Sequence, residues 1–342
     1  MQSTSSKLWM AYKLRLKRRW LLWRALRKRH QLSVVRNRTR QITRDAILGF
    51  STVRNEILRL PFFLKHYRAL GVEHFLIVDN NSDDGTREYL AEQPDVSVWG
   101  STHSYKKSRF GVDWLTWLQI RHGHGHWCLS VDADEILVYP DNETRPLRAL
   151  TGWLDARSIP SFGALMLDMY PKGRLDRQIY RSGQNPFEIL CWFDHDDYIS
   201  KMQDRTYYLS VQGGVRGRVF FPNEPSHAPH LNKIPLVKWN RRFAYVSSTH
   251  AILPRRLNKV FGQSAQNPPT GVLLHSKFLH VVIDKSREEK QRQEHFTYSS
   301  RYDHYYDGLM ANPDMWCEAS LHYEGWQQLA ELGLMSQGDW RP

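Results

Sequence analysis

Two carboxylates, one residue apart, follow an apolar run near the middle of the chain. Residues 127–131 (WCLSV) are typical of a buried strand, and Asp132 and Asp134 come directly after them. Side chains alternate along an extended chain, so these two carboxylates point to the same side and repel unless a cation lies nearby. Mg²⁺ and Mn²⁺ prefer oxygen ligands, and Mg²⁺ commonly binds one or two carboxylates together with substrate phosphates. The spacing therefore predicts a site for a divalent cation and a diphosphate. Glu135 points the other way and is expected to support the site or the fold.

The elements that must position these carboxylates alternate between strands and helices. Four apolar runs are expected to form strands: 46–50, 74–78, 96–100 and 127–131. Segments with helical spacing lie between them: 56–71, 87–93 and 111–123. This alternation predicts an α/β fold with a doubly wound, mainly parallel sheet and helices on both faces.

Polar residues follow three of these strands. They are Arg54 and Glu56 after the first, Asp79 and Asn81 after the second, and Asp132 and Asp134 after the fourth. Ligands of doubly wound sheets bind at the carboxyl ends of the strands. The sequence therefore predicts that these side chains gather at one edge of the sheet.

Beyond residue 140 the pattern is less regular. Strands are expected at 164–170, 243–253 and 271–279, with a charged helix at 285–296. Residues 213–221 (GGVRGRVFF) suggest a glycine turn followed by a strand, where Arg216 and Arg218 either bind an anion or line a solvated edge. Residues 222–235 contain four prolines and are expected to form a loop.

The charge of the chain is concentrated at its N-terminus. The net charge is +13, yet residues 1–44 alone contain 14 Lys or Arg and no Asp or Glu. The rest of the chain is therefore nearly neutral, which argues against a nucleic-acid-binding fold with a basic face.

Residues 7–30 of this arm favour a basic amphipathic helix. Its predicted apolar stripe consists of Leu8, Trp9, Tyr12, Leu16, Trp20, Trp23 and Leu26. A basic helix with Trp on its apolar face suits an anionic membrane surface. Packing on the protein's own body, and binding of nucleic acid by the arm alone, remain alternatives at this point.

The cysteines and the hydropathy indicate the compartment. Cys128, Cys191 and Cys317 are odd in number and widely spaced, which argues against a disulfide framework or a cysteine zinc site. No run of 18 apolar residues occurs, and the N-terminus lacks the uninterrupted apolar stretch of a signal peptide. We expect a cytoplasmic protein that is peripherally associated with the inner face of the cell membrane.

Three motifs, in order, resemble a known family. They are RNEILRLPFFLKHYRALGV (54–72), LIVDNNSDDGT (76–86) and WCLSVDADEIL (127–137). Together they resemble a family 2-type glycosyltransferase with the GT-A fold, clearly over residues 45–140 and more loosely over 273–279 and 287–296. The resemblance implies an enzyme that transfers a sugar from a nucleotide-sugar donor, most simply a UDP-sugar, with Mn²⁺ or Mg²⁺.

The resemblance also implies roles for individual residues. Asp79 and Asn81, together with Arg54 and Glu56, would line the nucleotide pocket. Asp132 would contact the donor directly or through the metal, and Asp134 would ligate the metal. In LLHSKFL (273–279), His275 is a candidate further metal ligand and Lys277 a candidate phosphate contact.

The catalytic base is the least defined part of the predicted site. An inverting transferase needs a group that removes the proton of the acceptor hydroxyl. Asp194 is favoured because Trp192, Phe193 and Tyr198 near it are suited to stacking on a sugar. Glu188, Glu224 and His250 are the alternatives. The Glu-Asp pair usual in the family is absent, which leaves the stereochemistry open.

The expected organisation has four parts. They are a basic arm (1–44), a nucleotide-sugar-binding half (45–140), an acceptor-binding half of the same catalytic domain (141–300) and a helical, aromatic C-terminal tail (301–342). The predicted function is a metal-dependent glycosyltransferase that uses a polysaccharide or lipid-linked acceptor in cell-surface glycan synthesis. A nucleotidyltransferase on the same fold and a non-catalytic membrane adaptor are the alternatives.

Overall fold

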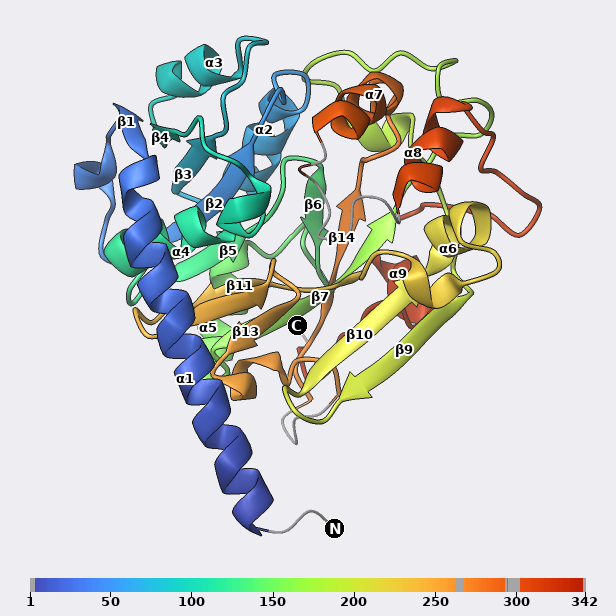
Figure 1. Ribbon diagram of the computed structural model, residues 1–342. Coiled ribbons are helices and arrows are strands. Elements are labelled where there is room, and N and C mark those ends of the chain that lie inside the picture. The colour runs from blue at the N-terminus through green and yellow to red at the C-terminus, as the bar shows by residue number, and fades with distance from the viewer. Residues whose placement is uncertain (1–3, 263–266, 293, 295–301, 341–342) are drawn as a thin grey trace.

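Apolar runs from both halves of the chain pair into one central sheet. The computed structural model describes residues 4–262, 267–292, 294 and 302–340, and within them this sheet has nine strands in the order β1-β4-β3-β2-β5-β11-β7-β14-β6 (Figure 1). Its strands are β1 (Ser33–Arg36), β2 (Ile47–Val53), β3 (His74–Asp79), β4 (Val96–Gly100), β5 (Trp127–Ser130), β6 (Glu135–Val138), β7 (Ser161–Asp168), β11 (Asn232–Lys238) and β14 (Gly271–His275).

Shorter strand pairs and nine α-helices complete the part of the chain that the structure describes. The short strands are β8 (Trp192–Phe193), β9 (Tyr198–Gln203), β10 (Tyr208–Gly213), β12 (Ala244–Ser247), β13 (Ala251–Leu253) and β15 (Leu321–His322). The helices are α1 (Thr4–Lys28), α2 (Leu60–Leu70), α3 (Thr86–Glu92), α4 (Val112–His122), α5 (Leu147–Ala156), α6 (Gly214–Phe220), α7 (Val282–Arg292), α8 (Asp303–Met310) and α9 (Trp326–Glu331).

The strands of the central sheet run mainly in one direction. β4, β3, β2 and β5 pair in parallel, and β7 and β14 pair in parallel farther along the sheet. β11 lies between β5 and β7 and is antiparallel to both, while β1 and β6 are antiparallel edge strands. The expected mainly parallel α/β sheet is thus confirmed.

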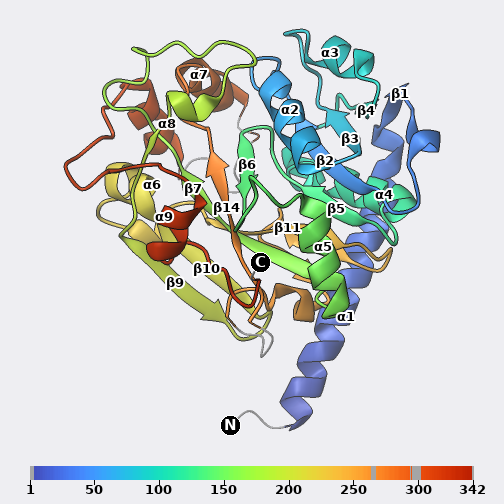
Figure 2. The ribbon, with the colours of Figure 1, turned by 180° about the vertical axis from the view of Figure 1, so that it is seen from behind.

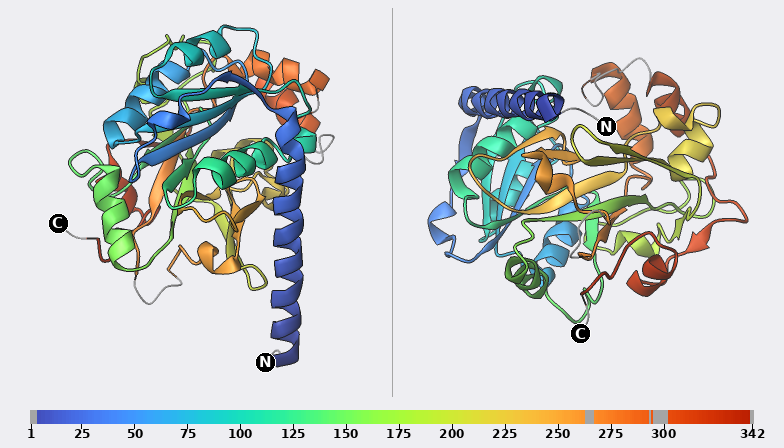
Figure 3. Two further views of the ribbon diagram at one scale, coloured as in Figure 1. Left: turned by 90° about the vertical axis from the view of Figure 1, so that its left-hand side faces the viewer. Right: turned by 90° about the horizontal axis from the view of Figure 1, so that it is seen from below.

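Helices cover both faces of this sheet, as the alternation of strands and helices predicts. Ile47 and Phe75 pack in one hydrophobic cluster with α2 and α5, whereas the adjacent Leu48 and Leu76 pack in a second cluster with α4. Successive strand residues point to opposite faces, so a strand buried on both sides reads as a continuous apolar run. Figures 2 and 3 show α2 and α5 on one face and α4 with α1 on the other.

The helix expected at 56–71 is shorter at its start. α2 begins at Leu60, with Pro61 in its first turn, where a missing N–H costs little. Gly71 ends it with φ 97°, a left-handed conformation that side-chain-bearing residues rarely adopt. The residues between β2 and α2 form a turn that belongs to the site described below.

Three expectations for the second half of the chain differ from the structure. The strand expected at 243–253 is instead a pair of short antiparallel strands, β12 and β13. Residues 214–220, which belong to the predicted glycine turn and strand at 213–221, form the helix α6, because Val215 and Phe220 pack with Phe278 and Tyr305 from distant parts of the chain. The predicted loop 222–235 ends early, because β11 starts at Asn232 and inserts into the central sheet. The last two differences arise from tertiary contacts between distant segments.

The predicted charged helix ends sooner than expected among the described residues. α7 ends at Arg292, and positions 293, 295 and 296 of the predicted 285–296 helix lie outside the residues that the structure describes. The N-terminal helix forms as expected. None of the described helices is long and apolar enough to cross a membrane.

The buried His74 predicts a loss of stability in acid. Its side chain begins β3, is 3% exposed, and its Nε2 lies 2.9 Å from Oγ of Ser97. Burial lowers the pKa of His74 to about 4, below the value near 6.5 in an unfolded chain. A lowered folded-state pKa stabilises the protein above about pH 6.5, and this stabilisation is lost as the pH falls toward 4.

We therefore expect the free energy of unfolding to fall by about 1–2 kcal/mol more in the wild type than in His74→Gln between neutral pH and about pH 5. Urea unfolding at the two pH values measures this. His124→Gln, a change on an exposed loop, is the matched control and should follow the wild type. Equal acid losses in all three proteins would contradict the prediction.

Candidate functional site

Five strands bring polar residues to the same edge of the central sheet. β2 and β3 are in register at Val53 and Asp79, so their carboxyl ends lie side by side. β7 and β14 are in register at Asp168 and His275, which are the last residues of those strands. β5 ends at Ser130, just before the Asp-Ala-Asp segment. The predicted gathering of polar groups at one edge is present, and β7 and β14 enlarge it.

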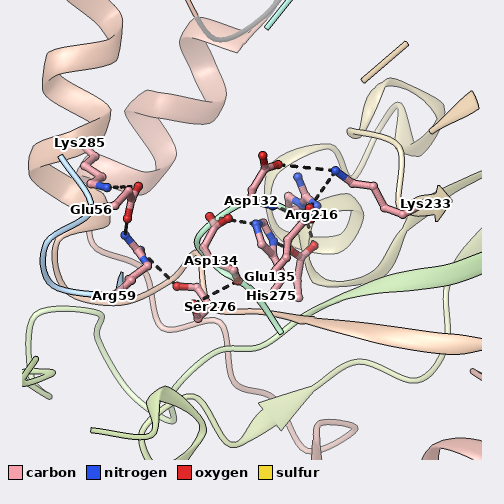
Figure 4. Close-up of polar contacts among 11 residues, drawn as sticks. Glu56, Arg59, Asp132, Asp134, Glu135, Arg216, Lys233, His275, Ser276 and Lys285 are labelled. Atoms are coloured by element: carbon pink, nitrogen blue, oxygen red, sulfur yellow. Dashed lines mark hydrogen bonds and ion pairs between the residues drawn. The ribbon is translucent and has the colours of Figure 1, made fainter. Parts of the chain in front are cut away.

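The centre of the site is a chain of three side chains from distant segments. Nδ1 of His275 lies 2.6 Å from Oδ1 of Asp168, and its Nε2 lies 3.2 Å from Oδ2 of Asp134. The backbone holds the same contact, because the Ser276 N–H donates to the Asp134 carbonyl oxygen at 2.7 Å. Figure 4 shows Asp134 and His275 facing each other. One imidazole nitrogen is therefore oriented by Asp168, and the other points toward Asp134.

The charges of these three groups support one another. Burial alone would lower the pKa of His275, but the carboxylates of Asp134 and Asp168 outweigh burial and raise it. Burial would raise the pKa of Asp134, yet His275, Arg59 and Lys277 hold it well below its ordinary value. The site thus keeps a carboxylate ionised in a largely buried place.

Asp168 is fixed from its other side by an arginine. Nε of Arg216, on α6, donates to Oδ2 of Asp168 at 2.6 Å, and both side chains are about 95% buried or more. Burial would raise the pKa of Asp168, but Arg216 and His275 together lower it. Nη2 of Arg216 has no hydrogen-bond partner among the residues that the structure describes. A buried, unpartnered guanidinium N–H beside the cavity is suited to an anionic ligand.

A lysine pairs with the remaining carboxylates of the motif, most closely with Glu135. Nζ of Lys233, on β11, lies 2.8 Å from Oε1 of Glu135 and 3.7 Å from Oδ2 of Asp132. Glu135 is 1% exposed and accepts the backbone N–H of Asp132 at 3.1 Å, whereas the Asp132 side chain is half exposed. Glu135 therefore supports the loop from behind, as its side-chain direction predicted.

A second charged group lies on the opposite side of Asp134. Glu56 pairs with Arg59 at 2.9 Å and with Lys285 of α7, and Arg59 donates to the Ser276 carbonyl oxygen at 3.2 Å (Figure 4). Nearby, Arg54 bonds Glu288 of α7 at 3.1 Å. The turn after β2 is thus tied to α7 and to the residue that follows His275.

Most of these groups line one cavity of about 1480 Å³, whereas Asp168 and Ser276 lie outside its lining. Ligand pockets for small molecules usually measure about 300–1,000 Å³, so this cavity has room for a larger ligand or for two. Its wall near Asp134 is rich in cations: Arg54, Arg59, Arg216, Lys233, Lys277 and Lys285. Burial lowers the pKa of Lys277 to about 8. The cavity is suited to a polyanion such as a diphosphate.

The donor set fits a divalent cation that is bound together with a ligand. No three His, Cys, Asp or Glu side chains among the described residues converge as a complete metal site. Asp134 and His275 would supply two protein ligands, with Asp132 at the mouth. His275 has the arrangement common for a metal-binding histidine, because a carboxylate orients its other nitrogen. The remaining coordination positions are then left to ligand oxygens and water, as is usual for Mg²⁺.

Most of the predicted site residues come together in this cavity. Its lining includes Arg54, Glu56, Asp132, Asp134, His250, His275 and Lys277. These residues come from positions between 54 and 277, so the fold assembles them from separate segments of the chain. The three histidines of HGHGH (122–126) do not line it, and Nδ1 of His126 bonds the Ala46 carbonyl oxygen at 2.9 Å.

Asp79 and Asn81 do not line the cavity. Asp79 is fully buried and pairs with Arg87 of α3 at 2.7 Å, which holds the turn after β3. Asn81 is exposed, with φ 59°, and its carbonyl oxygen accepts from Arg54 at 2.7 Å. Asn80 lines the cavity instead. A donor contact through Asp79 would therefore require the Arg87 pair to open.

The favoured base, Asp194, is occupied elsewhere, and this corrects the sequence-based choice. Arg218 donates to both of its carboxylate oxygens, at 2.8 and 3.0 Å, and the Tyr170 hydroxyl donates to it as well. Asp194 is 8% exposed and does not line the cavity. Glu188 is exposed outside the cavity lining, whereas the other two candidates, Glu224 and His250, belong to it.

Sequence reasoning missed Asp168, Arg59 and Lys233. Asp168 ends a strand, so the strand-end rule that selected Asp132 would have selected it had β7 been given its correct end. Arg59 lies only three residues after Glu56, inside a stretch predicted as helix. Lys233 lies in the segment that was predicted as a loop, and no motif or strand end in the sequence marked it as a site residue.

Two solved structures are distantly similar to the chain. No family model matches the chain, and no curated protein matches it. Among solved structures, 4-diphosphocytidyl-2C-methyl-D-erythritol synthase aligns at 15% identity and a TM-score of 0.26, over 41% of this chain and 66% of that one. The chain thus spans just under two thirds of that enzyme's length.

A protein from Bacillus anthracis, described as a glucose-1-phosphate thymidylyltransferase in complex with a sucrose, aligns at 10% identity and a TM-score of 0.29. That alignment covers 76% of this chain and 82% of the other. These values are too low to show a family.

The ion pairs of Lys233 predict that replacing it lowers the free energy of unfolding more than replacing Lys238 on the same strand. Lys233→Met leaves the buried Glu135 carboxylate without its cation, so we expect the free energy of unfolding to fall by about 3 kcal/mol. Lys238→Met, also on β11, removes an exposed pair with Asp155 and a 5.9 Å contact with the Trp127 ring, and it should cost less than about 1 kcal/mol. Urea denaturation measures both, and equal losses would contradict the buried role of Lys233.

Proposed function

We propose that this protein is a metal-dependent glycosyltransferase of the GT-A type. It transfers a sugar from a nucleoside diphosphate sugar, most simply a UDP-sugar, to a polysaccharide or lipid-linked acceptor, with inversion. The observation that carries the proposal is the contact between Asp134 and His275, which line a large cavity together with several cations, while Asp168 orients His275 from outside the lining. The motif resemblance over residues 45–140 supports the sugar-transfer chemistry.

The residues around Asp134 are suited to the departure of a diphosphate. Asp134 and His275, with Asp132 at the mouth, would hold Mn²⁺ or Mg²⁺, which when bound neutralises charge on the diphosphate. Arg59, Lys277 and the unpartnered Nη2 of Arg216 line the same wall and would bind phosphate oxygens. Preorganised donors of this kind stabilise the negative charge that develops on the leaving oxygen, because they need no reorganisation.

The proton of the acceptor hydroxyl needs a base on the cavity wall. His250 lies there, and its Nδ1 is 2.6 Å from the Asn232 carbonyl oxygen. A carbonyl oxygen only accepts, so Nδ1 carries the hydrogen and Nε2 keeps a free electron pair. Burial, with Lys233 nearby, lowers the pKa of His250 well below 6.5 and keeps the ring neutral. We therefore assign the base to His250, with Glu224 as the second candidate.

The proposed acceptor belongs to cell-surface glycan synthesis at the inner face of the cell membrane. The basic N-terminal arm supports this location because its charge is opposite to that of the cytoplasmic leaflet. The size of the cavity supports a donor and an acceptor bound together.

A donor assay tests the reaction class. The protein is incubated with Mn²⁺ and UDP-, GDP- or CDP-sugars, and in parallel with Mn²⁺, nucleoside triphosphates and a sugar phosphate. Release of nucleoside diphosphate and of pyrophosphate is followed separately. We expect nucleoside diphosphate, abolished by EDTA and by Asp134→Asn. Asp155→Asn, a change to an exposed carboxylate outside the cavity, is the control and should keep activity. Pyrophosphate formation from a nucleoside triphosphate and a sugar phosphate would instead indicate a nucleotidyltransferase.

The assignment of the base to His250 predicts that His250→Asn lowers kcat, whereas Asp194→Asn lowers stability. His250→Asn should lower kcat by about 100-fold or more, with little change in the KM for the donor, because general-base catalysis contributes about 10²–10⁴-fold. Asp194→Asn should leave kcat within a few-fold and instead lower the free energy of unfolding by about 2 kcal/mol, because Arg218 loses a charged partner. Steady-state kinetics and urea unfolding separate these effects. A kcat loss in Asp194→Asn alone would reverse the assignment.

A further inference from the structure

The two long faces of α1 have different surroundings. Leu14, Leu21 and Ala25 are buried, and the first two pack with Ala244 and Leu253 of the β12–β13 hairpin. α1 also packs along α4, where Arg24 pairs with the fully buried Asp113 at 2.8 Å. This inner face holds the helix to the body.

The outer face of α1 carries the predicted apolar stripe and leaves it in solvent. Among the described residues, twelve large apolar side chains are strongly exposed, and seven of them lie on this one face. They are 43–68% exposed: Leu8, Trp9, Tyr12, Leu16, Trp20, Trp23 and Leu26. A contiguous exposed patch of this kind marks an interaction surface, because isolated soluble proteins rarely carry one.

Cations lie against the aromatic rings of this outer face. Nζ of Lys13 is 5.0 Å from the ring centre of Trp9, and the guanidinium of Arg27 is 4.8 Å from that of Trp23. With no acidic residue in 1–44, nothing on this arm would repel an anionic surface. Trp and Arg or Lys side by side suit the headgroup layer, where the ring lies at the apolar boundary and the charge meets phosphates.

We propose that the outer face of α1, defined by these seven residues, docks on the surface of an anionic lipid bilayer. Each basic residue near such a surface contributes favourably, and the Trp and Leu side chains enter the boundary between headgroups and acyl chains. The inner face stays packed on the body during docking, so the helix need not detach. Figure 3 shows α1 at the edge of the molecule, with its N-terminal half projecting beyond the body.

The docked orientation brings the cavity close to the bilayer. Arg24 and Lys28, in the last two turns of α1, line the cavity that also contains Asp132 and Asp134. An acceptor held in the membrane would therefore meet the cavity beside the docking helix. This last step depends on the proposed function, whereas the docking itself does not, because vesicle binding requires no donor or metal.

Co-sedimentation of the full-length protein with vesicles tests the docking. Vesicles of phosphatidylcholine mixed with phosphatidylglycerol are compared with vesicles of phosphatidylcholine alone. We expect strong binding to the anionic vesicles only. The triple variant Trp9→Ser, Trp20→Ser, Trp23→Ser should reduce the partition coefficient at least about tenfold, which corresponds to about 1.4 kcal/mol.

The matched control removes exposed apolar side chains elsewhere. Ile179→Ser combined with Ile199→Ser, at 70% and 47% exposure, should bind vesicles like the wild type. Lys13→Gln with Arg27→Gln should weaken binding to the anionic vesicles, and an unchanged circular dichroism spectrum shows that each variant is folded.

Unchanged binding by the folded triple tryptophan variant would overturn the proposal, as would equal binding of the wild type to both kinds of vesicle. A wild type that ignores vesicles but dimerises through this face, or binds nucleic acid through it, would overturn it as well. If docking holds while the donor assay is negative, only the proposed function fails.

Discussion

Concentrated charge at one edge of the central sheet is the constraint on which the rest of the site depends. Carboxylates that are buried in a protein are costly unless cations or hydrogen bonds compensate them. Here three of the carboxylates pair with different cations: Asp168 with Arg216, Glu135 with Lys233, and Glu56 with Arg59. These cations come from α6, β11 and the turn before α2. The site therefore exists only when segments far apart in the sequence are folded together.

The same pairs explain how the site is oriented. Asp168 directs His275, and His275 in turn faces Asp134, so the imidazole is held at both nitrogens. Arg216 is held by Asp168 at Nε but keeps an unpartnered Nη2 beside the cavity. A group fixed at one end and free at the other loses little entropy when it binds a ligand. The cavity is therefore preorganised for an anion, which suits transfer from a nucleoside diphosphate sugar.

The N-terminal helix shows how one element serves two surroundings. Its inner residues pack against the body of the protein, while its outer apolar residues remain exposed and available for binding a second surface. A helix with apolar side chains on two opposite faces is costly in water unless both faces are covered. The body covers one face, and the proposed bilayer covers the other.

The sequence by itself determined the α/β class, the alternation of strands and helices through residue 131, and the carboxylates that end those strands. These features are local, because strand runs, helical spacing and strand ends are legible in short windows. The exposed stripe of α1 was predicted residue by residue for the same reason. Only the tertiary structure showed that the helix packs through its opposite face, since that depends on α4 and the β12–β13 hairpin.

Tertiary structure alone also decided which polar residues work together. In the folded protein Asp194 pairs with Arg218 and Asp79 pairs with Arg87, and neither carboxylate lines the cavity. Asp168, Arg59 and Lys233 take part in the site instead. The pairing of buried acidic and basic side chains cannot be derived from a single sequence. That choice is made by contacts between residues tens to hundreds of positions apart, as between Asp134 and His275, and the electrostatic cost of an unpaired buried charge enforces it.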